Sequence, residues 1–285
     1  MIKNGVIKIK KIKKHLVVRI VTFVSLSVLA FSFLYPLFFM FINSFKTKTE
    51  YRKDAFALPE SWNFDNYVYM LDQFELIRYF FNTIFIAFIS IGVMMLLAVF
   101  ASYAFARLPF KGRSLVYMLV IGTMFIPAQV TMIPMYQMFS RMHLVNTFTG
   151  VILCNIAGGL PGAVLLLTAN FRGIPVELIE ACKIDGAGYF KVIWNVIIPL
   201  GKSTIAINVI LSFVSQCNDL FTPMILLQEM DKRTVMVALS SIMSKTSGDQ
   251  AFQMTGLLLA VLPPLLLYIC LQKYLVKGLT VGAIK

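Results

Sequence analysis

FFNTIFIAFISIGVMMLLAVFASYA, residues 80–104, is an uninterrupted apolar stretch of 25 residues without one charged side chain. A helix rises about 1.5 Å per residue, so this length crosses roughly 30 Å of hydrocarbon. The stretch does not alternate between polar and apolar residues, which favours a membrane helix over a barrel strand. Five further segments are similarly apolar, with Asp219 and Lys273 as their two charged residues: residues 20–42, 115–135, 148–169, 204–227 and 254–275. The sequence therefore predicts an all-α integral membrane protein with six transmembrane helices.

The composition of the whole chain agrees with this fold class. Of 285 residues, 59% are hydrophobic and 14% are charged, and the mean hydropathy is +0.80. A soluble domain carries about 25% charged residues, so lipid must cover much of this surface. The net charge of +13 does not indicate a nucleic-acid surface, because the basic residues lie between the apolar segments. We expect membrane lipid, and no nucleic acid, among the partners.

The distribution of Lys and Arg predicts the orientation of the chain. If the N-terminus lies inside, the cytosolic segments and the last membrane edge hold 17 basic and three acidic residues, and the outer segments hold nine basic and nine acidic residues, with Asp219 inside a span. Positive charge accumulates on the cytosolic side of cell-membrane proteins. We therefore expect a multi-pass protein with both termini in the cytosol. Its parts are a basic N-terminus (1–19), a six-span domain (20–275) and a cytosolic tail (276–285).

The long cytosolic loop, residues 170–203, has the pattern of two short helices separated by a glycine turn. Pro175 suits the first position of a helix, where its missing N–H costs nothing, and Glu177 lies where the helix dipole favours an acid. Gly186 can end this helix in a left-handed conformation. A second, amphipathic helix follows, and Pro199 marks the entry to the next span. From spacing alone, an ordinary connector at the membrane surface remains an alternative.

Several strings in the chain resemble a known family. Residues 180–187, Glu-Ala-Cys-Lys-Ile-Asp-Gly-Ala, together with residues 197–200, resemble the EAA loop of ABC importer permeases, with Cys182 in place of the second alanine. Further segments in the same order resemble the maltose-type carbohydrate uptake class of these binding-protein-dependent permeases: residues 125–136, 144–147, 218–221 and 278–285.

The resemblance implies a permease subunit of an ATP-driven importer for a sugar or an oligosaccharide. Its partners would be a second permease subunit, a cytosolic ATPase dimer and an extracytoplasmic solute-binding protein. The first helix of the loop would be a coupling helix that docks on the ATPase and rocks the spans between inward-facing and outward-facing states. The residues implied in that contact are Glu180, Ala181, Asp185, Gly186 and Ala187.

No motif for nucleotide chemistry or metal binding is complete. Gly201-Lys-Ser-Thr204 lacks the first glycine of a phosphate loop, since Val196 stands in its place. The chain contains neither an HExxH nor a CxxC pattern. We therefore expect no cofactor, no metal and no enzymatic activity here, with ATP hydrolysis in a separate subunit.

Polar side chains within the spans form the candidate path for the solute. They are costly in lipid, and planar amides and carboxylates suit sugar hydroxyl groups. For each of them, hydrogen bonding between packed helices is the alternative. The competing function for the whole chain is a stand-alone secondary transporter or channel. The candidates are Gln129, Asn155, Asn208, Gln216, Asn218 and Asp219.

Overall fold

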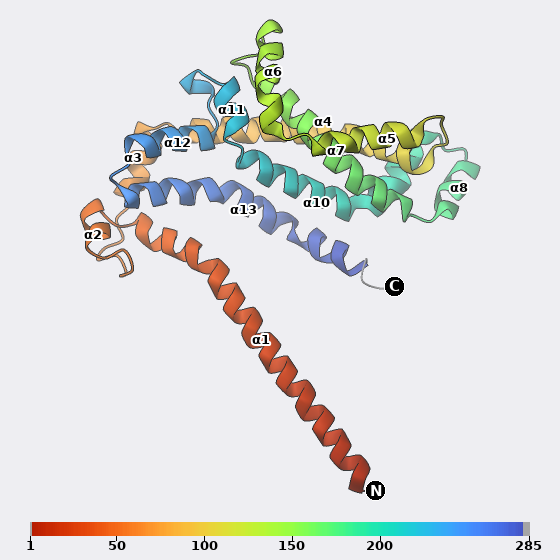
Figure 1. Ribbon diagram of the computed structural model, residues 1–285, viewed down its shortest axis with the longest axis horizontal. Helices are drawn as coiled ribbons and strands as arrows, with labels where there is room; N and C mark the ends of the chain where they lie inside the picture. Colours follow the sequence, from red (N-terminus) through yellow and green to blue (C-terminus); the bar gives the residue numbers. More distant parts are fainter. Residues whose placement is uncertain (1, 282–285) are drawn as a thin grey trace. The chain divides into compact units, whose positions relative to one another are not determined.

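The computed structural model describes residues 2–281, and it describes the side-chain surroundings of residues 17–273 (Figure 1). Every regular element in this range is a helix. The chain folds as two compact units. Of the described residues, the first unit holds those up to Met70 together with Thr246–Leu259, and the second holds Leu71–Lys245 and those from Ala260 onward.

The first unit is organised around an aromatic cluster. Phe45 packs against Trp62, Phe64 and Tyr67, with ring centroids 4.9–5.3 Å apart. The Ser44 hydroxyl shares a 2.6 Å hydrogen bond with the hydroxyl of Tyr67, so this cluster fixes the chain where the first helix ends. The helices that lie wholly or partly in this unit are α1 (Ile2–Ser44), α2 (Lys48–Lys53), α3 (Asp65–Gln73) and α13 (Gln250–Val281).

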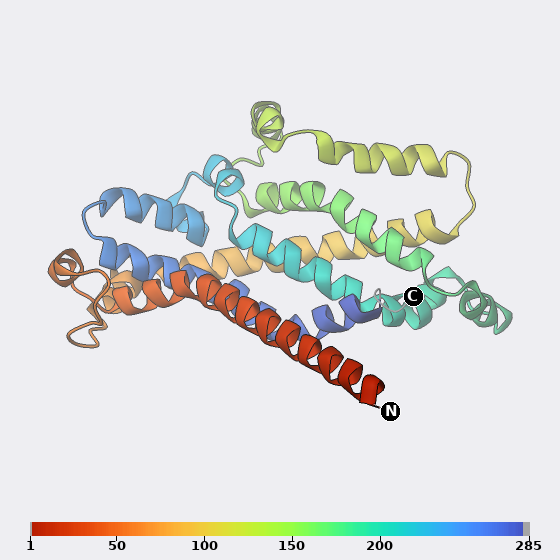
Figure 2. The ribbon, with the colours of Figure 1, turned by 60° about the horizontal axis from the view of Figure 1, so that its bottom comes forward.

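The second unit holds the helical core, in which α4, α7 and α10 lie side by side (Figures 1 and 2). Small residues allow this close packing, since a Cβ added to Gly159 of α7 would lie 2.5 Å from the sulfur of Met94 in α4. The elements that begin in this unit are α4 (Leu76–Arg107), α5 (Arg113–Gly122), η1 (Thr123–Phe125), α6 (Ala128–Arg141), α7 (Phe148–Arg172), α8 (Val176–Ile184), α9 (Tyr189–Val192), η2 (Ile193–Ile197), α10 (Ile198–Cys217), α11 (Phe221–Leu226), η3 (Met230–Lys232) and α12 (Val235–Lys245).

Five described helices are long and apolar enough to cross a membrane, and a sixth crossing results if one bent pair is counted as a single span. The prediction of an all-α membrane protein is confirmed, with five or six candidate spans by length and composition. The five helices are Val17–Ser44, Leu76–Arg107, Phe148–Arg172, Tyr189–Cys217 and Gln250–Lys273.

The third predicted span, residues 115–135, is not one straight helix. The segment Arg113–Phe125 is followed by α6, and the two axes differ by 100°. Ile126, between them, is extended, with φ −86° and ψ 115°. The ring of Pro127 explains this conformation, because a proline crowds the residue before it out of the helical region. The expected straight crossing is therefore corrected to a bent pair.

The fifth predicted span, residues 204–227, begins and ends earlier than expected. A helical run extends over Tyr189–Cys217, through α9, η2 and α10. The second helix expected within residues 170–203 is thus the beginning of this span and not a separate element. Pro199 lies inside the run, directly after the π-type turn η2. A wider turn avoids the clash that a proline makes with the carbonyl four residues earlier.

Both predicted terminal segments continue helices. α1 begins at Ile2, so described residues of the basic segment 1–19 extend the first span, and the side chains of residues 1–16 lie outside the described range. α13 reaches Val281. The last four residues of the predicted tail, 282–285, lie outside the described residues, and with them half of the string 278–285.

Candidate functional site

α8 is a short helix closed by a glycine turn, as the sequence predicts. Pro175 occupies its N-cap position. At the other end, Gly186 adopts φ +77° and donates its N–H to the carbonyl of Lys183 at 2.9 Å. The N–H of Ala187 donates to the carbonyl of Cys182 at 3.1 Å. This pair of hydrogen bonds ends the helix sharply, and the left-handed backbone at position 186 favours a residue without Cβ.

One face of α8 is anchored in the core of the second unit. Ile179 is 3% exposed and Ile174, in the linker before the helix, is 7% exposed. Both belong to the apolar cluster that contains Tyr103 of α4 and Phe171 of α7. Because these contacts are made on one side only, α8 is held against the ends of α4 and α7 while its other side faces outward.

The outward face of α8 carries most of the predicted coupling residues. Ala187 is buried in the core and therefore supports the turn from behind. Ile184, which sequence reasoning missed, is 86% exposed. It lies one helical turn after Glu180, and this spacing on an amphipathic helix is the signal that could have identified it. An apolar side chain this exposed is typical of a surface that a partner covers. The exposed predicted residues are Glu180, Ala181, Asp185 and Gly186.

Three of the six predicted pathway residues have hydrogen-bond partners within the protein. Asn208 is 4% exposed, and its side-chain nitrogen donates to a carbonyl one turn earlier in α10 at 2.9 Å. Gln216 Oε1 accepts a hydrogen bond from Ser90 Oγ of α4 at 2.6 Å. Asp219 Oδ1 accepts the N–H of Thr222, at the start of α11, at 3.2 Å. Of these three contacts, the one between Gln216 and Ser90 joins two helices, as the packing alternative expects, and the other two are local bonds.

The other three predicted pathway residues come from separate elements. Gln129 is exposed on α6, Asn155 is half-buried on α7, and Asn218 is exposed directly after α10. None of the six lines either of the two cavities described for the second unit. One of these, of about 200 Å³, is apolar and lies between α4 and η2. A sugar path through these residues therefore stays a prediction.

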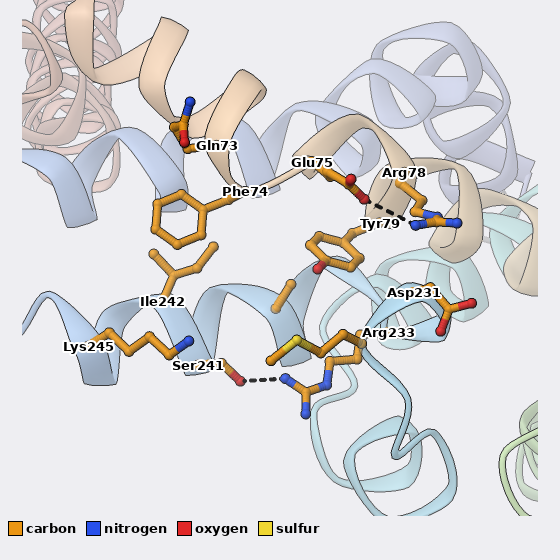
Figure 3. Close-up of a pocket in the computed structure, with 12 residues that line it drawn as sticks. Gln73, Phe74, Glu75, Arg78, Tyr79, Asp231, Arg233, Ser241, Ile242 and Lys245 are labelled. Atoms are coloured by element: carbon orange, nitrogen blue, oxygen red, sulfur yellow. Dashed lines mark hydrogen bonds and ion pairs between the residues drawn. The ribbon is translucent and has the colours of Figure 1, made fainter.

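The larger cavity, of about 410 Å³, lies where α4 begins, at the opposite end of that helix from α8 (Figure 3). Phe74 and Tyr79 form one side of it. On the facing side, Arg233 Nη1 donates to Ser241 Oγ of α12 at 3.3 Å, and Lys245 follows one turn later. An aromatic wall thus faces a wall in which hydrogen-bond donors lie beside apolar side chains such as Ile242.

The charges around this cavity leave cationic donors free. Arg78 forms an ion pair with Glu75 at 3.1 Å. In contrast, Nε of Arg233 is buried and has no hydrogen-bond partner among the described residues. No acid within residues 17–273 pairs with Lys245. The cavity can therefore accept a carboxylate or a group of hydroxyls.

The cavity is held open by hydrogen bonds from α4. Asn82 Nδ2 donates to the carbonyls of Asp231 and Arg233, at 2.9 and 3.0 Å. Thr83 Oγ1 accepts the N–H of Val235 at 2.9 Å and so satisfies a free donor at the start of α12. Sequence reasoning missed this cavity, because its two walls are far apart in the chain.

Comparison with known proteins gives consistent matches over most of the chain. Residues 94–281 match the family described as "Binding-protein-dependent transport system inner membrane component". The chain is 30% identical to the probable starch degradation products transport system permease protein AmyC of Thermoanaerobacterium thermosulfurigenes, over 96% of this chain and 99% of that protein. It is 28% identical to the arabinooligosaccharides transport system permease protein AraQ of Bacillus subtilis, over 90% and 92%.

A solved structure has the same fold. A chain of a bacterial ABC transporter involved in the import of the acidic polysaccharide alginate superposes with a TM-score of 0.76 and 24% sequence identity. The match covers 90% of this chain and 95% of that chain.

Proposed function

Because this chain belongs to the family of binding-protein-dependent transport system inner membrane components, we propose that it carries a sugar or an oligosaccharide across the cell membrane. It is a permease subunit of an ABC importer and a multi-pass membrane protein. The sugar class is supported by relatives whose transport systems handle arabinooligosaccharides and starch degradation products. A stand-alone transporter, which would need no ATPase, has no comparable support.

The main support for this mechanism is that α8 has one buried side and one exposed side. Ile179 anchors one side in the core, and Glu180 and Ile184 lie on the exposed side. A cytosolic ATPase dimer would dock on this exposed side, with Ala181, Asp185 and Gly186 in the contact and Ala187 behind it. A short helix packed on a bundle passes on a rigid-body displacement. The Gly201-Lys-Ser-Thr204 string lies inside α10, so ATP hydrolysis belongs to that partner.

The orientation that this requires places α8 and both termini in the cytosol and the cavity at the start of α4 outside. The excess of Lys and Arg in the segments assigned to the inside supports it. An extracytoplasmic solute-binding protein would then meet the cavity, where Arg233 and Lys245 offer donors to an acidic side chain.

A second permease subunit and lipid together would cover the exposed apolar surface. Phe31 and Phe33 of α1, for example, are 75% and 77% exposed. Gln129, Asn155 and Asn218 stay candidates for direct contact with the sugar, since the other three pathway candidates already have hydrogen-bond partners within the protein.

The test uses the intact complex with its ATPase and its binding protein. Ile184→Asp places a charge in the proposed contact, so the ATPase should no longer co-purify and sugar uptake should fall at least about tenfold. Met230→Asp is the matched control, because Met230 is a similarly exposed apolar residue at the opposite end of α4. It should leave ATPase capture unchanged.

Gly186→Trp tests the same helix through its closing turn. A tryptophan at φ +77° is strained, and its bulk lies beside the docking face. ATP-coupled uptake should be lost while the subunit is still inserted in the membrane. Normal ATPase capture and uptake in both variants, or ion-driven uptake by the purified chain alone, would contradict the proposed function.

A further inference from the structure

Arg107, the last residue of α4, reaches across to the end of α7 and to the linker before α8. Its Nε and Nη2 donate to the carbonyl of Phe171 at 3.1 and 2.8 Å. Nη2 also donates to the carbonyl of Arg172 at 3.1 Å and to that of Ile174. One guanidinium thus meets three carbonyl groups in the stretch that leads directly into Pro175, the N-cap residue of α8.

The chemistry of this junction suits an arginine. The last carbonyls of a helix have no partner within that helix, and α7 ends at Arg172. A guanidinium offers several donors in one rigid plane, and its charge is favourable at the negative end of a helix. A lysine could reach the same carbonyls only with a single ammonium group.

The helices on which Arg107 acts form a firm base. Ser102 Oγ of α4 donates to the carbonyl of Val164 in α7 at 3.2 Å. The ring of Phe171 packs so closely on α10 that a Cβ added to Gly201 would lie 2.7 Å from it. The carbonyl of Phe171, which accepts from two nitrogens of Arg107, therefore belongs to a residue packed against α10, in a helix that is hydrogen-bonded to α4.

We propose that Arg107 is a positioning residue that makes α8 and the helical bundle move as one body. The proposal rests on the coupling role of α8 proposed above. Without the guanidinium, the linker before α8 is held only by the burial of Ile174 and by the backbone hydrogen bonds of Gly173 and Ile174 to carbonyls of α7. It should then yield more readily to a displacement of α8. With the guanidinium, a push of the ATPase on α8 is passed directly to α4 and α7, so each ATP hydrolysed yields movement of the spans.

The experiment measures, in the reconstituted complex, how much sugar is moved for each ATP hydrolysed. In Arg107→Gln the ATPase should still co-purify, because the docking face is unchanged, while this ratio should fall roughly tenfold. Arg107→Lys should recover part of the loss. Arg113→Gln is the matched control, because Arg113 is an exposed arginine close in sequence with one 3.3 Å bond to the carbonyl of Leu108. It should keep the unaltered ratio.

Hydrogen exchange gives a second readout, which should speed up over Val176–Ile184 in Arg107→Gln and stay unchanged in the α4–α7 core. An unaltered transport ratio or unaltered exchange in α8 would overturn the proposal. So would a loss of ATPase capture as large as that of Ile184→Asp, because Arg107 would then only maintain the fold. Normal ATPase capture by Ile184→Asp is a separate result, which would remove the coupling role of α8 itself.

Discussion

At the scale of single residues, the absence of one Cβ sets the distance between two helices. Gly201 of α10 faces the ring of Phe171, and an added Cβ would lie 2.7 Å from a ring carbon. An aromatic ring in a packed core cannot bend away as a flexible side chain can, so α10 must shift instead. Gly158 of α7, in contrast, has no atom within 4 Å of the position of an added Cβ.

Gly201→Ala should therefore destabilise the protein by about 1–3 kcal/mol. Gly158→Ala should be neutral or slightly stabilising, because alanine favours a helix by about 1 kcal/mol over glycine. Thermal unfolding of the purified complex in detergent measures the difference. Equal unfolding temperatures for the two variants would show that α10 can shift at this contact without a loss of stability.

At the scale of elements, the η3–α12 segment depends on α4 for its position. Asn82→Ala removes both hydrogen bonds to the carbonyls of Asp231 and Arg233, at a cost of about 1–3 kcal/mol. We expect faster amide exchange over Met230–Ala238 and weaker stimulation of the ATPase by the binding protein. Gln73→Ala, which changes an exposed residue of the same cavity, is the control. Stimulation lost equally in both variants would argue against a preformed cavity.

The sequence predicts continuous spans well and broken ones poorly. α4 and α7 follow their apolar segments, and each ends at the arginine that comes shortly after the segment, Arg107 and Arg172. At Pro127 the high mean hydropathy of the whole segment does not reveal the break. The proline itself is not decisive either, because a proline in a membrane helix can leave the helix continuous but kinked. The early start of the fifth span at Tyr189 was hidden by Pro199, because the π-type turn that accommodates it has no sequence signature.

The same distinction applies to the candidate site. The turn at Gly186 is a local feature and could be predicted from neighbouring residues. Arg107 and the three carbonyls that it holds lie more than sixty residues apart, and Arg233 and Phe74 meet only in the folded chain. No local sequence pattern indicates such contacts, so they could be predicted only from a structure that shows how α4 packs against its neighbours.

At the scale of the whole molecule, the proposed orientation can be tested with single cysteines. The four native cysteines, Cys154, Cys182, Cys217 and Cys270, would first be replaced by serine. A thiol reagent that does not cross membranes should then label Lys245→Cys in intact cells. It should label Glu180→Cys only after the cells are permeabilised, because α8 would face the cytosol. The reverse labelling pattern would show that the chain has the opposite orientation in the membrane.

The continuous helical run Tyr189–Cys217 is long enough that a small rotation at one end produces a large displacement at the other. Four residues separate it from the end of α8, and it contains 29 residues, which corresponds to a rod of about 44 Å. A tilt of about 5° at its near end swings the far end of such a rod by about 4 Å. If the π-type turn serves as the pivot, a small displacement of α8 becomes a larger movement at the far end of α10, where the hydrogen bond between Gln216 and Ser90 would carry α4 along.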